Sequence, residues 1–253
     1  MARIFITGSA DGLGQLTARL LVERGHQVVL HARDERRSRE AIGSVPGAEE
    51  VLIGDLSRVD QVKRLASEAN AIGRFDAIIH NAGVYRASGE QLLAVNTLAP
   101  YILTCLMMTP RRLIYLSSGM HLQGNADPER MTSGRANVSY SDSKLWVVLL
   151  ANAVARRWPD VYVNSIDPGW VPTKMGGRDA PDDLALGVET QAWLAVSDDA
   201  AARVTGHYLH HKRTARHHPA VDDTKLRMNS LRRVSRSRES WCRSNSRKLD
   251  KPG

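Results

Sequence analysis

The sequence contains little cysteine and no apolar run long enough to cross a membrane. Two cysteines in 253 residues, Cys105 and Cys242, cannot build a disulfide framework and suit a reducing compartment. The apolar residues after Met1 are too few for the centre of a signal peptide, and the longest apolar helical stretch, residues 145–155, is shorter than a bilayer requires. We therefore expect a cytoplasmic protein with no membrane span.

The charge of the chain is concentrated at its C-terminal end. Residues 211–253 contain 13 lysines and arginines and 4 acidic residues, a net charge of +9, whereas the whole chain carries +8. We expect one domain over residues 1–210 and a basic extension over residues 211–253, partly disordered because residues 232–238 lack apolar periodicity. A short helix over residues 221–231 is an alternative. The extension is predicted to be solvated, although it could bind polyanions nonspecifically.

Apolar segments of strand length alternate with longer segments of helical pattern. The expected strands cover residues 4–6, 28–30, 51–53, 77–79, 113–116 and 161–166, and the expected helices include residues 59–72, 91–107, 141–157 and 182–196. Parallel strands need helical crossovers, so the alternation predicts an α/β fold with one doubly wound parallel sheet flanked by helices on both faces.

A glycine-rich turn follows the first expected strand. Glycines occupy positions 8, 12 and 14, and a helical pattern of leucines over residues 16–21 comes next. Such a turn aims backbone N–H groups at a pyrophosphate, and its glycines let the ligand approach closely. An ordinary tight loop is the alternative, but a strand before the turn and a helix after it favour nucleotide binding.

Tyr140 and Lys144 are four residues apart in an apolar helical stretch, so their side chains share one face. An unperturbed tyrosine has a pKa near ~10 and is a poor proton shuttle at neutral pH. A neighbouring ammonium would stabilise the phenolate and lower that pKa. Together with a nucleotide-binding turn, the pair indicates a nicotinamide-dependent carbonyl or alcohol oxidoreductase, although the spacing alone occurs by chance in many helices.

Seven motifs follow one another at spacings that resemble the short-chain dehydrogenases/reductases. They are residues 7–14, Asp55, residues 81–83, Asn96, residues 117–118, Tyr140 with Lys144, and residues 168–173. The resemblance extends to about Gly206 and is nearest to the retinol-dehydrogenase-like branch. It implies a Rossmann-like sheet and NAD(P)-dependent interconversion of an aldehyde or ketone and its alcohol.

The resemblance also implies two sets of site residues and no metal site. The catalytic set is Asn96, Ser118, Tyr140 and Lys144: Tyr140 exchanges the proton, Ser118 polarises the substrate oxygen, Lys144 lowers the tyrosine pKa, and Asn96 holds a water on the proton path. The cofactor set is Gly8, Ser9, Asp11, Gly12, Leu13, Gly14, Arg33, Asp55, Leu56, Asn81, Ala82, Gly83, Tyr140, Lys144, Pro168, Gly169, Val171 and Thr173.

The end of the second expected strand predicts NADP(H) in preference to NAD(H). An NAD-selective site usually has an acidic residue there, whereas this chain has Ala32 followed by Arg33. A guanidinium can bind a 2′-phosphate that a carboxylate would repel. The alternative is that Arg33 is a solvated charge within the basic run through residues 36–39.

Several other positions admit two interpretations. Asp55 either contacts the adenine ring or caps the following helix, and Asn96 taken alone would be an incidental polar helix residue. His80 replaces the family's first asparagine before residues 81–83, and we expect it to form structural hydrogen bonds. Ser117 and Ser118 should face opposite ways on an extended strand, so only one reaches the site.

The substrate is the least determined feature. Residues 119–139 contain apolar side chains, and we expect this loop to shape the substrate pocket. His121 within it could touch the substrate, but a surface position is favoured. Residues 174–186 are a candidate lid. We expect an apolar carbonyl compound as substrate and, by family analogy, a homo-oligomer. The functional alternatives are a catalytically silent NADP(H) sensor and a polyanion-binding protein that acts through its basic extension.

Overall fold

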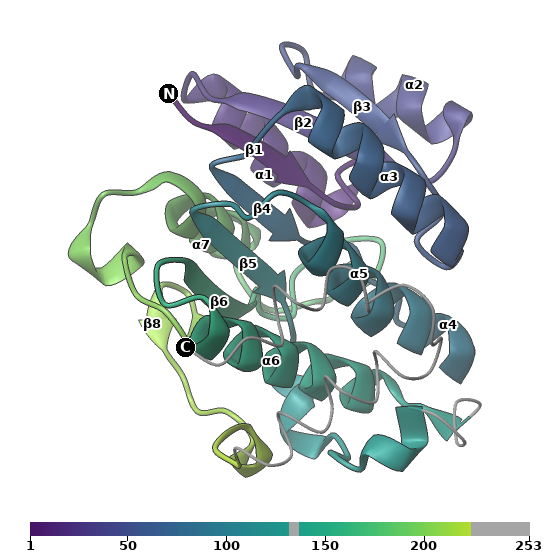
Figure 1. Cartoon of the computed structure of the whole chain (residues 1–253), viewed down its shortest axis with the longest axis vertical. Coiled ribbons are helices and arrows are strands. Elements are labelled where there is room, and N and C mark those ends of the chain that lie inside the picture. Colours follow the sequence, from purple (N-terminus) through teal and green to yellow (C-terminus); the bar gives the residue numbers. More distant parts are fainter. Residues whose placement is uncertain (132–136, 224–253) are drawn as a thin grey trace.

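A computed structural model describes residues 1–131 and 137–223 of the chain (Figure 1). The strands are β1 Arg3–Ile6, β2 Gln27–Ala32, β3 Glu50–Ile53, β4 Ala77–His80, β5 Arg112–Leu116, β6 Tyr162–Asp167, β7 Tyr208–His210 and β8 Arg213–Thr214. The helices are α1 Gly12–Glu23, α2 Glu35–Ser44, α3 Val59–Ile72, α4 Gly89–Leu93, α5 Ala99–Leu106, α6 Tyr140–Arg157 and α7 Leu184–Val196. Short helical turns are η1 Ala94–Leu98, η2 Gly119–Gln123, η3 Pro128–Met131, η5 Ala200–Ala202 and η6 Pro219–Val221.

The strands form one sheet in the order β3-β2-β1-β4-β5-β6-β7-β8. Every neighbouring pair from β3 to β7 is parallel, and β8 pairs antiparallel with β7. The order reverses between β1 and β4, where the crossovers change from one face of the sheet to the other (Figure 1). This arrangement confirms the predicted doubly wound sheet, and it places the carboxyl ends of the central strands beside a crevice that can receive a ligand.

Two apolar layers cover the sheet because successive strand residues face opposite ways. In β1, Phe5 packs with α3, α5 and α6, whereas Ile4 and Ile6 pack with α1, α2 and α7. All three side chains are fully buried. A third cluster lies between α6 and the C-terminal part of the described chain, and it includes Tyr208 and Val221.

The fold departs from the sequence-based expectations in the helix before β5 and at the C-terminal end of the sheet. The helix expected over residues 91–107 is divided into α4, the π-helical turn η1 and α5. The folded chain also continues past the expected domain end at residue 210, because β8 extends the sheet and the buried Val221 packs into the third cluster. Most of the alternative helix over residues 221–231 lies outside the described residues.

Among the helices of the described chain, none combines the length and apolar character needed to cross a bilayer. Residues 1–131 and 137–223 also contain no cluster of three potential metal-binding side chains.

Candidate active site

The glycine turn between β1 and α1 is closed tightly on its inner side. Gly8 has a positive φ of 64°, and a Cβ atom there would lie 2.9 Å from the Cα of Ala82. Asn81 Nδ2 donates to the carbonyls of Thr7 at 2.9 Å and Gly8 at 3.1 Å. Neither Gly8 nor Gly14 has room for a side chain, because an added Cβ on Gly14 would collide with Asn81.

The outer side of the same turn is open. Gly12 has a φ of 54°, and a Cβ atom there would meet only Thr173 at 4.0 Å. Gly12 also begins α1, so the positive end of the helix lies at this space, where the Gly12 N–H donates to the Asp11 carboxylate at 2.8 Å. A cradle of this kind fits the phosphates of a dinucleotide.

Ser9 and Leu13 do not face that cradle. The Ser9 hydroxyl donates to the carbonyl of Ile6 at 2.9 Å and accepts the His31 N–H at 2.8 Å, so it fastens the turn to β2. The side chain of Leu13 lies beside Gly187 of α7. A Cβ atom added to Gly187 would lie 3.5 Å from Leu13 Cδ2 and 2.6 Å from the carbonyl oxygen of Pro168. Ser9 and Leu13 therefore hold the glycine turn against β2 and α7.

Sequence reasoning did not identify His31, which joins the glycine turn to the end of β3. The backbone N–H of Gly8 donates to His31 Nδ1 at 2.9 Å, and His31 Nε2 donates to the carbonyl of Gly54 at 2.8 Å. An amide can only donate and a carbonyl can only accept, so the ring is neutral with its proton on Nε2. Burial lowers the pKa of His31 to about 4. The sequence signal that could have identified His31 was a polar residue within an otherwise apolar strand.

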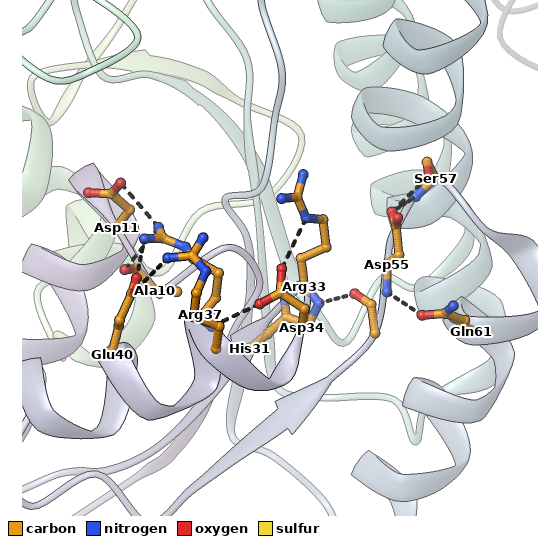
Figure 2. Close-up of polar contacts among 12 residues, drawn as sticks. Ala10, Asp11, His31, Arg33, Asp34, Arg37, Glu40, Asp55, Ser57 and Gln61 are labelled. Atoms are coloured by element: carbon orange, nitrogen blue, oxygen red, sulfur yellow. Dashed lines mark hydrogen bonds and ion pairs between the residues drawn. The ribbon is translucent and has the colours of Figure 1, made fainter.

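The arginines at the start of α2 differ in their surroundings. Arg33 has a side chain that is 67% exposed and forms an ion pair with the adjacent Asp34 at 3.5 Å. Asp34 caps α2 by accepting the Arg37 N–H. Arg37 reaches back to the glycine turn and contacts the Ala10 carbonyl at 3.3 Å and the Asp11 carboxylate at 3.1 Å (Figure 2). Arg37 is therefore held at the glycine turn, whereas the Arg33 side chain extends into solvent.

Asp55 and Leu56 have structural partners of their own. Asp55 Oδ1 accepts the N–H of Ser57 at 2.9 Å and its hydroxyl at 2.7 Å, while the Asp55 N–H donates to Gln61 (Figure 2). The carboxylate thus shapes the turn before α3 but does not cap that helix, whose N-cap residue is Arg58. Leu56 is buried in the layer under α3.

The turn after β4 lies against α6. A Cβ atom on Gly83 would lie 3.3 Å from Lys144 Nζ and 3.4 Å from Asn96 Oδ1. Asn96 lies in the π-helical turn, accepts the Val84 N–H at 2.8 Å and donates to Ser143 Oγ at 2.9 Å. Asn96 therefore joins this turn to α6.

His80, at the end of β4, has the structural role that was expected of it. The ring is buried, its Nε2 lies 3.2 Å from the Thr104 hydroxyl, and it stacks on Tyr115 with ring centroids 4.8 Å apart. Burial lowers the pKa of His80 to about 3. The ring is thus neutral and belongs to an interior polar network.

Tyr140, Lys144 and Ser118 meet at the carboxyl end of β5. Tyr140 begins α6, whose N-terminus carries a capping box. Lys144, one turn later, places Nζ 5.5 Å from the centroid of the Tyr140 ring and donates to the Leu116 carbonyl at 2.9 Å. The Ser118 side chain accepts the Met120 N–H and forms a hydrogen bond with Tyr140. Ser117 instead donates to the Lys144 carbonyl, so only Ser118 faces the site.

The predicted depression of the Tyr140 pKa is not found. Burial raises the pKa of Tyr140 to about 12, against the opposing effect of the Ser118 hydrogen bond, and the charge of Asp167 adds to the rise. Burial also lowers the pKa of Lys144 to about 8, which Asp167 partly opposes. The reason is geometric: the ammonium of Lys144 lies at the tyrosine ring and donates to a backbone carbonyl.

The segment after β6 closes the site from the opposite side. Gly169 has a φ of 85°, and its N–H donates to Asp167 Oδ1 at 3.0 Å. Val171 is buried, while Thr173 lies across from Gly12. Lys174 then forms an ion pair with Asp11 at 2.6 Å. Residues that are far apart in the sequence thus surround the space above the glycine turn.

Comparison with known proteins agrees with this geometry. The sequence matches the family described as short chain dehydrogenase over residues 2–183. An uncharacterized oxidoreductase, AN7799, of Emericella nidulans is 45% identical over 245 residues, which cover 92% of this chain and 95% of that protein. A Streptomyces protein named "putative daunorubicin C-13 ketoreductase DnrU" is 30% identical over 234 residues, which cover 81% of this chain and 82% of that protein.

A solved structure shares the fold at low sequence identity. The blue fluorescent protein from a metagenomic library, determined in complex with NADPH, superimposes with a TM-score of 0.68 and is 20% identical, over 83% of this chain and 95% of that one. The family match and the relative at 45% identity decide the assignment. The chain therefore belongs to the short-chain dehydrogenase/reductase family of NAD(P)-dependent oxidoreductases.

Proposed function

We propose that this enzyme interconverts an aldehyde or ketone and the corresponding alcohol with NADP(H), and that Tyr140 is the acid/base. The observation that carries the proposal is the close approach of Ser118, Tyr140 and Lys144 at the carboxyl end of β5. In the sheet, only β4 lies between β5 and β1, the strand before the glycine turn. The relative named as a ketoreductase supports a carbonyl substrate.

The side chains divide the acid/base work between them. When bound, the nicotinamide supplies or accepts the hydride at the carbonyl carbon. With a pKa of about 12, Tyr140 is protonated at neutral pH and can donate its proton to the substrate oxygen. Ser118 Oγ accepts the Met120 N–H, so its own hydrogen is available to the same oxygen. Lys144 contributes a positive charge that stabilises the tyrosinate left behind.

The preference for NADP(H) rests on charge near the end of β2. Arg33 and Arg37 are the guanidiniums that would meet a 2′-phosphate, and Ala32 replaces the acidic residue of NAD-selective sites. The remaining cofactor positions are proposed from the sequence. The side chains of Ser9 and Leu13 face away from the cradle, and Leu56 is buried under α3. We expect Arg33→Ala to weaken NADPH binding about tenfold, the loss of one charge-assisted contact, with NADH binding unchanged.

The expected substrate is apolar because exposed apolar side chains border the site. The rings of Tyr85 and Tyr140 pack edge to face with their centroids 4.8 Å apart. Trp170, next to Gly169, is 61% exposed. Met120 and Leu122 follow Ser118 and are also exposed. Surfaces of this kind bind the apolar body of a ligand whose carbonyl points inward.

A panel of aldehydes, ketones and alcohols, followed by nicotinamide absorbance with NADPH and NADH side by side, tests the proposal. Tyr140→Phe should abolish turnover while NADPH fluorescence still reports binding. Equal turnover by that variant would remove Tyr140 as the proton donor. Binding of NADPH by the unaltered protein without turnover of any panel member would favour the silent sensor.

A further inference from the structure

His121 is buried in the interior beside the active site. It was expected at the surface, yet its side chain is fully buried, and its ring packs on Tyr208 with centroids 4.4 Å apart. His121 belongs to η2, which starts directly after Ser118. His121 is buried because β7 and the residues after it, which are distant in the sequence, pack over η2.

Two backbone hydrogen bonds determine the protonation of His121. Nδ1 lies 2.8 Å from the carbonyl of Ser118, and the backbone N–H of His218 lies 3.2 Å from Nε2. A carbonyl only accepts and an amide only donates, so Nδ1 carries the proton and Nε2 holds a lone pair. Only a neutral imidazole can make both bonds.

The partner of His121 belongs to a segment that packs against the catalytic helix. His218 caps η6 by accepting the Ala220 N–H at 3.1 Å. Val221, at the end of η6, is buried in the cluster that contains Leu145 and Trp146 of α6. Residues 215–221, which we call the C-terminal strap, therefore contact both the helix of Tyr140 and the turn of Ser118.

We propose that His121 is a positioning residue: its neutral imidazole joins the backbone of Ser118 to the C-terminal strap and so holds Ser118 opposite Tyr140. The inference rests on the proposed role of Ser118 in the reaction. Ser118 has no side-chain bond to the strap of its own among the described contacts, so His121 supplies the connection. Displacement of a catalytic group by about 1 Å can lower a rate by as much as about 100-fold.

The connection should depend on pH. Burial lowers the pKa of His121; the Ser118 carbonyl and Asp167 of β6 oppose this, and His218 and His217 of the strap reinforce it. Tyr208 of β7 faces the ring and is itself uncharged, because burial raises its pKa. A proton on Nε2 would point at the His218 N–H and break that bond. The rate should therefore fall as pH drops below the ordinary histidine range.

Two substitutions separate the two bonds. In His121→Asn the side-chain amide can still donate to the Ser118 carbonyl but cannot reach the His218 N–H, and in His121→Gln the longer side chain can accept from His218. We expect His121→Asn to lower kcat about tenfold with an unchanged Kd for NADPH, to lose the acidic fall in rate, and to exchange the amide hydrogens of residues 218–221 faster. His121→Gln should restore slow exchange in the strap. His207→Asn is the control, since His207 contacts Thr214 at the protein surface.

The measurements use the full chain and the carbonyl compound that it reduces fastest. If His121→Asn does not fold, Val221→Ala loosens the strap without altering His121 or Ser118, and it should lower kcat in the same direction. A folded His121→Asn protein with the wild-type kcat and pH profile would overturn the inference, as would a wild-type kcat in Val221→Ala when exchange in the strap is fast. Tyr140→Phe is measured in parallel: activity in that variant counts against the proposed function, and not against the link between His121 and the strap.

Discussion

The ammonium of Lys174 lies 2.6 Å from the carboxylate of Asp11, although 163 residues separate them in the chain. Asp11 also accepts the Gly12 N–H at 2.8 Å and an Arg37 guanidinium hydrogen at 3.1 Å. Burial tends to raise the pKa of Asp11, but these partners, Lys174 foremost, bring it below its usual value. The loop after β6 is thereby fastened to the glycine turn.

Lys174→Ala should release this loop without unfolding the protein. The amide N–H groups of Gly176 and Gly177 bond to Thr173, and they should exchange with solvent about threefold faster because an exposed ion pair contributes less than about 1 kcal/mol. Hydrogen exchange and thermal unfolding provide the two measurements. Arg178→Ala on the same loop is the control, and equal exchange in both variants would show that the ion pair does not hold the loop.

Gly8→Ala should impair both folding and cofactor binding. Its positive φ and the 2.9 Å approach of an added Cβ to Ala82 predict a loss of about 1–3 kcal/mol in the free energy of unfolding. Gly43→Ala in α2 is the matched control, because nothing lies within 4 Å of its Cβ position and alanine favours a helix. Denaturant unfolding and NADPH titration would measure the difference, and equal stability of the two variants would contradict the packing argument.

The buried His31 should make the protein less stable in acid. Its pKa is about 4 when folded and near 6.5 when unfolded, so the unfolded chain binds more protons as pH falls between these values. The stability present above pH 6.5 is therefore lost toward pH 4, by about 3 kcal/mol from this residue. His31→Asn should be less stable at pH 7 yet depend less on pH. Urea unfolding at several pH values tests this, with His207→Asn expected to follow the wild type.

Asp167→Asn should move the pH profile of alcohol oxidation toward lower pH. The negative charge of Asp167 raises the pKa values of both Tyr140 and Lys144, and oxidation requires Tyr140 in its ionised form. The amide oxygen of asparagine can still accept the Gly169 N–H, so the turn should persist. Rates measured against pH, with the exposed Asp198→Asn as control, test the charge effect. An unmoved profile would show that Asp167 does not act on Tyr140.

Local patterns in the sequence were sufficient for most of the fold, whereas the roles of the site residues stay predictions. The strand, glycine turn and helix at the N-terminus depend on residues close together in the chain, and so does the shared face of Tyr140 and Lys144. The apolar pattern of residues 91–107 predicted one continuous helix and did not indicate the π-helical turn that contains Asn96. Strands β7 and β8 were missed because they are short and follow no apolar run.

The order of the chemistry-bearing residues along the chain was enough, by itself, to determine the fold class and the family, because backbone periodicity and motif spacing are local properties. Tertiary structure alone decided the charge states. The tautomers of His31 and His121 depend on backbone groups from other elements, and the pKa of Tyr140 depends on how completely the assembled site excludes water. Burial and long-range partners arise only when distant segments pack together, so no pattern within one segment could have specified them.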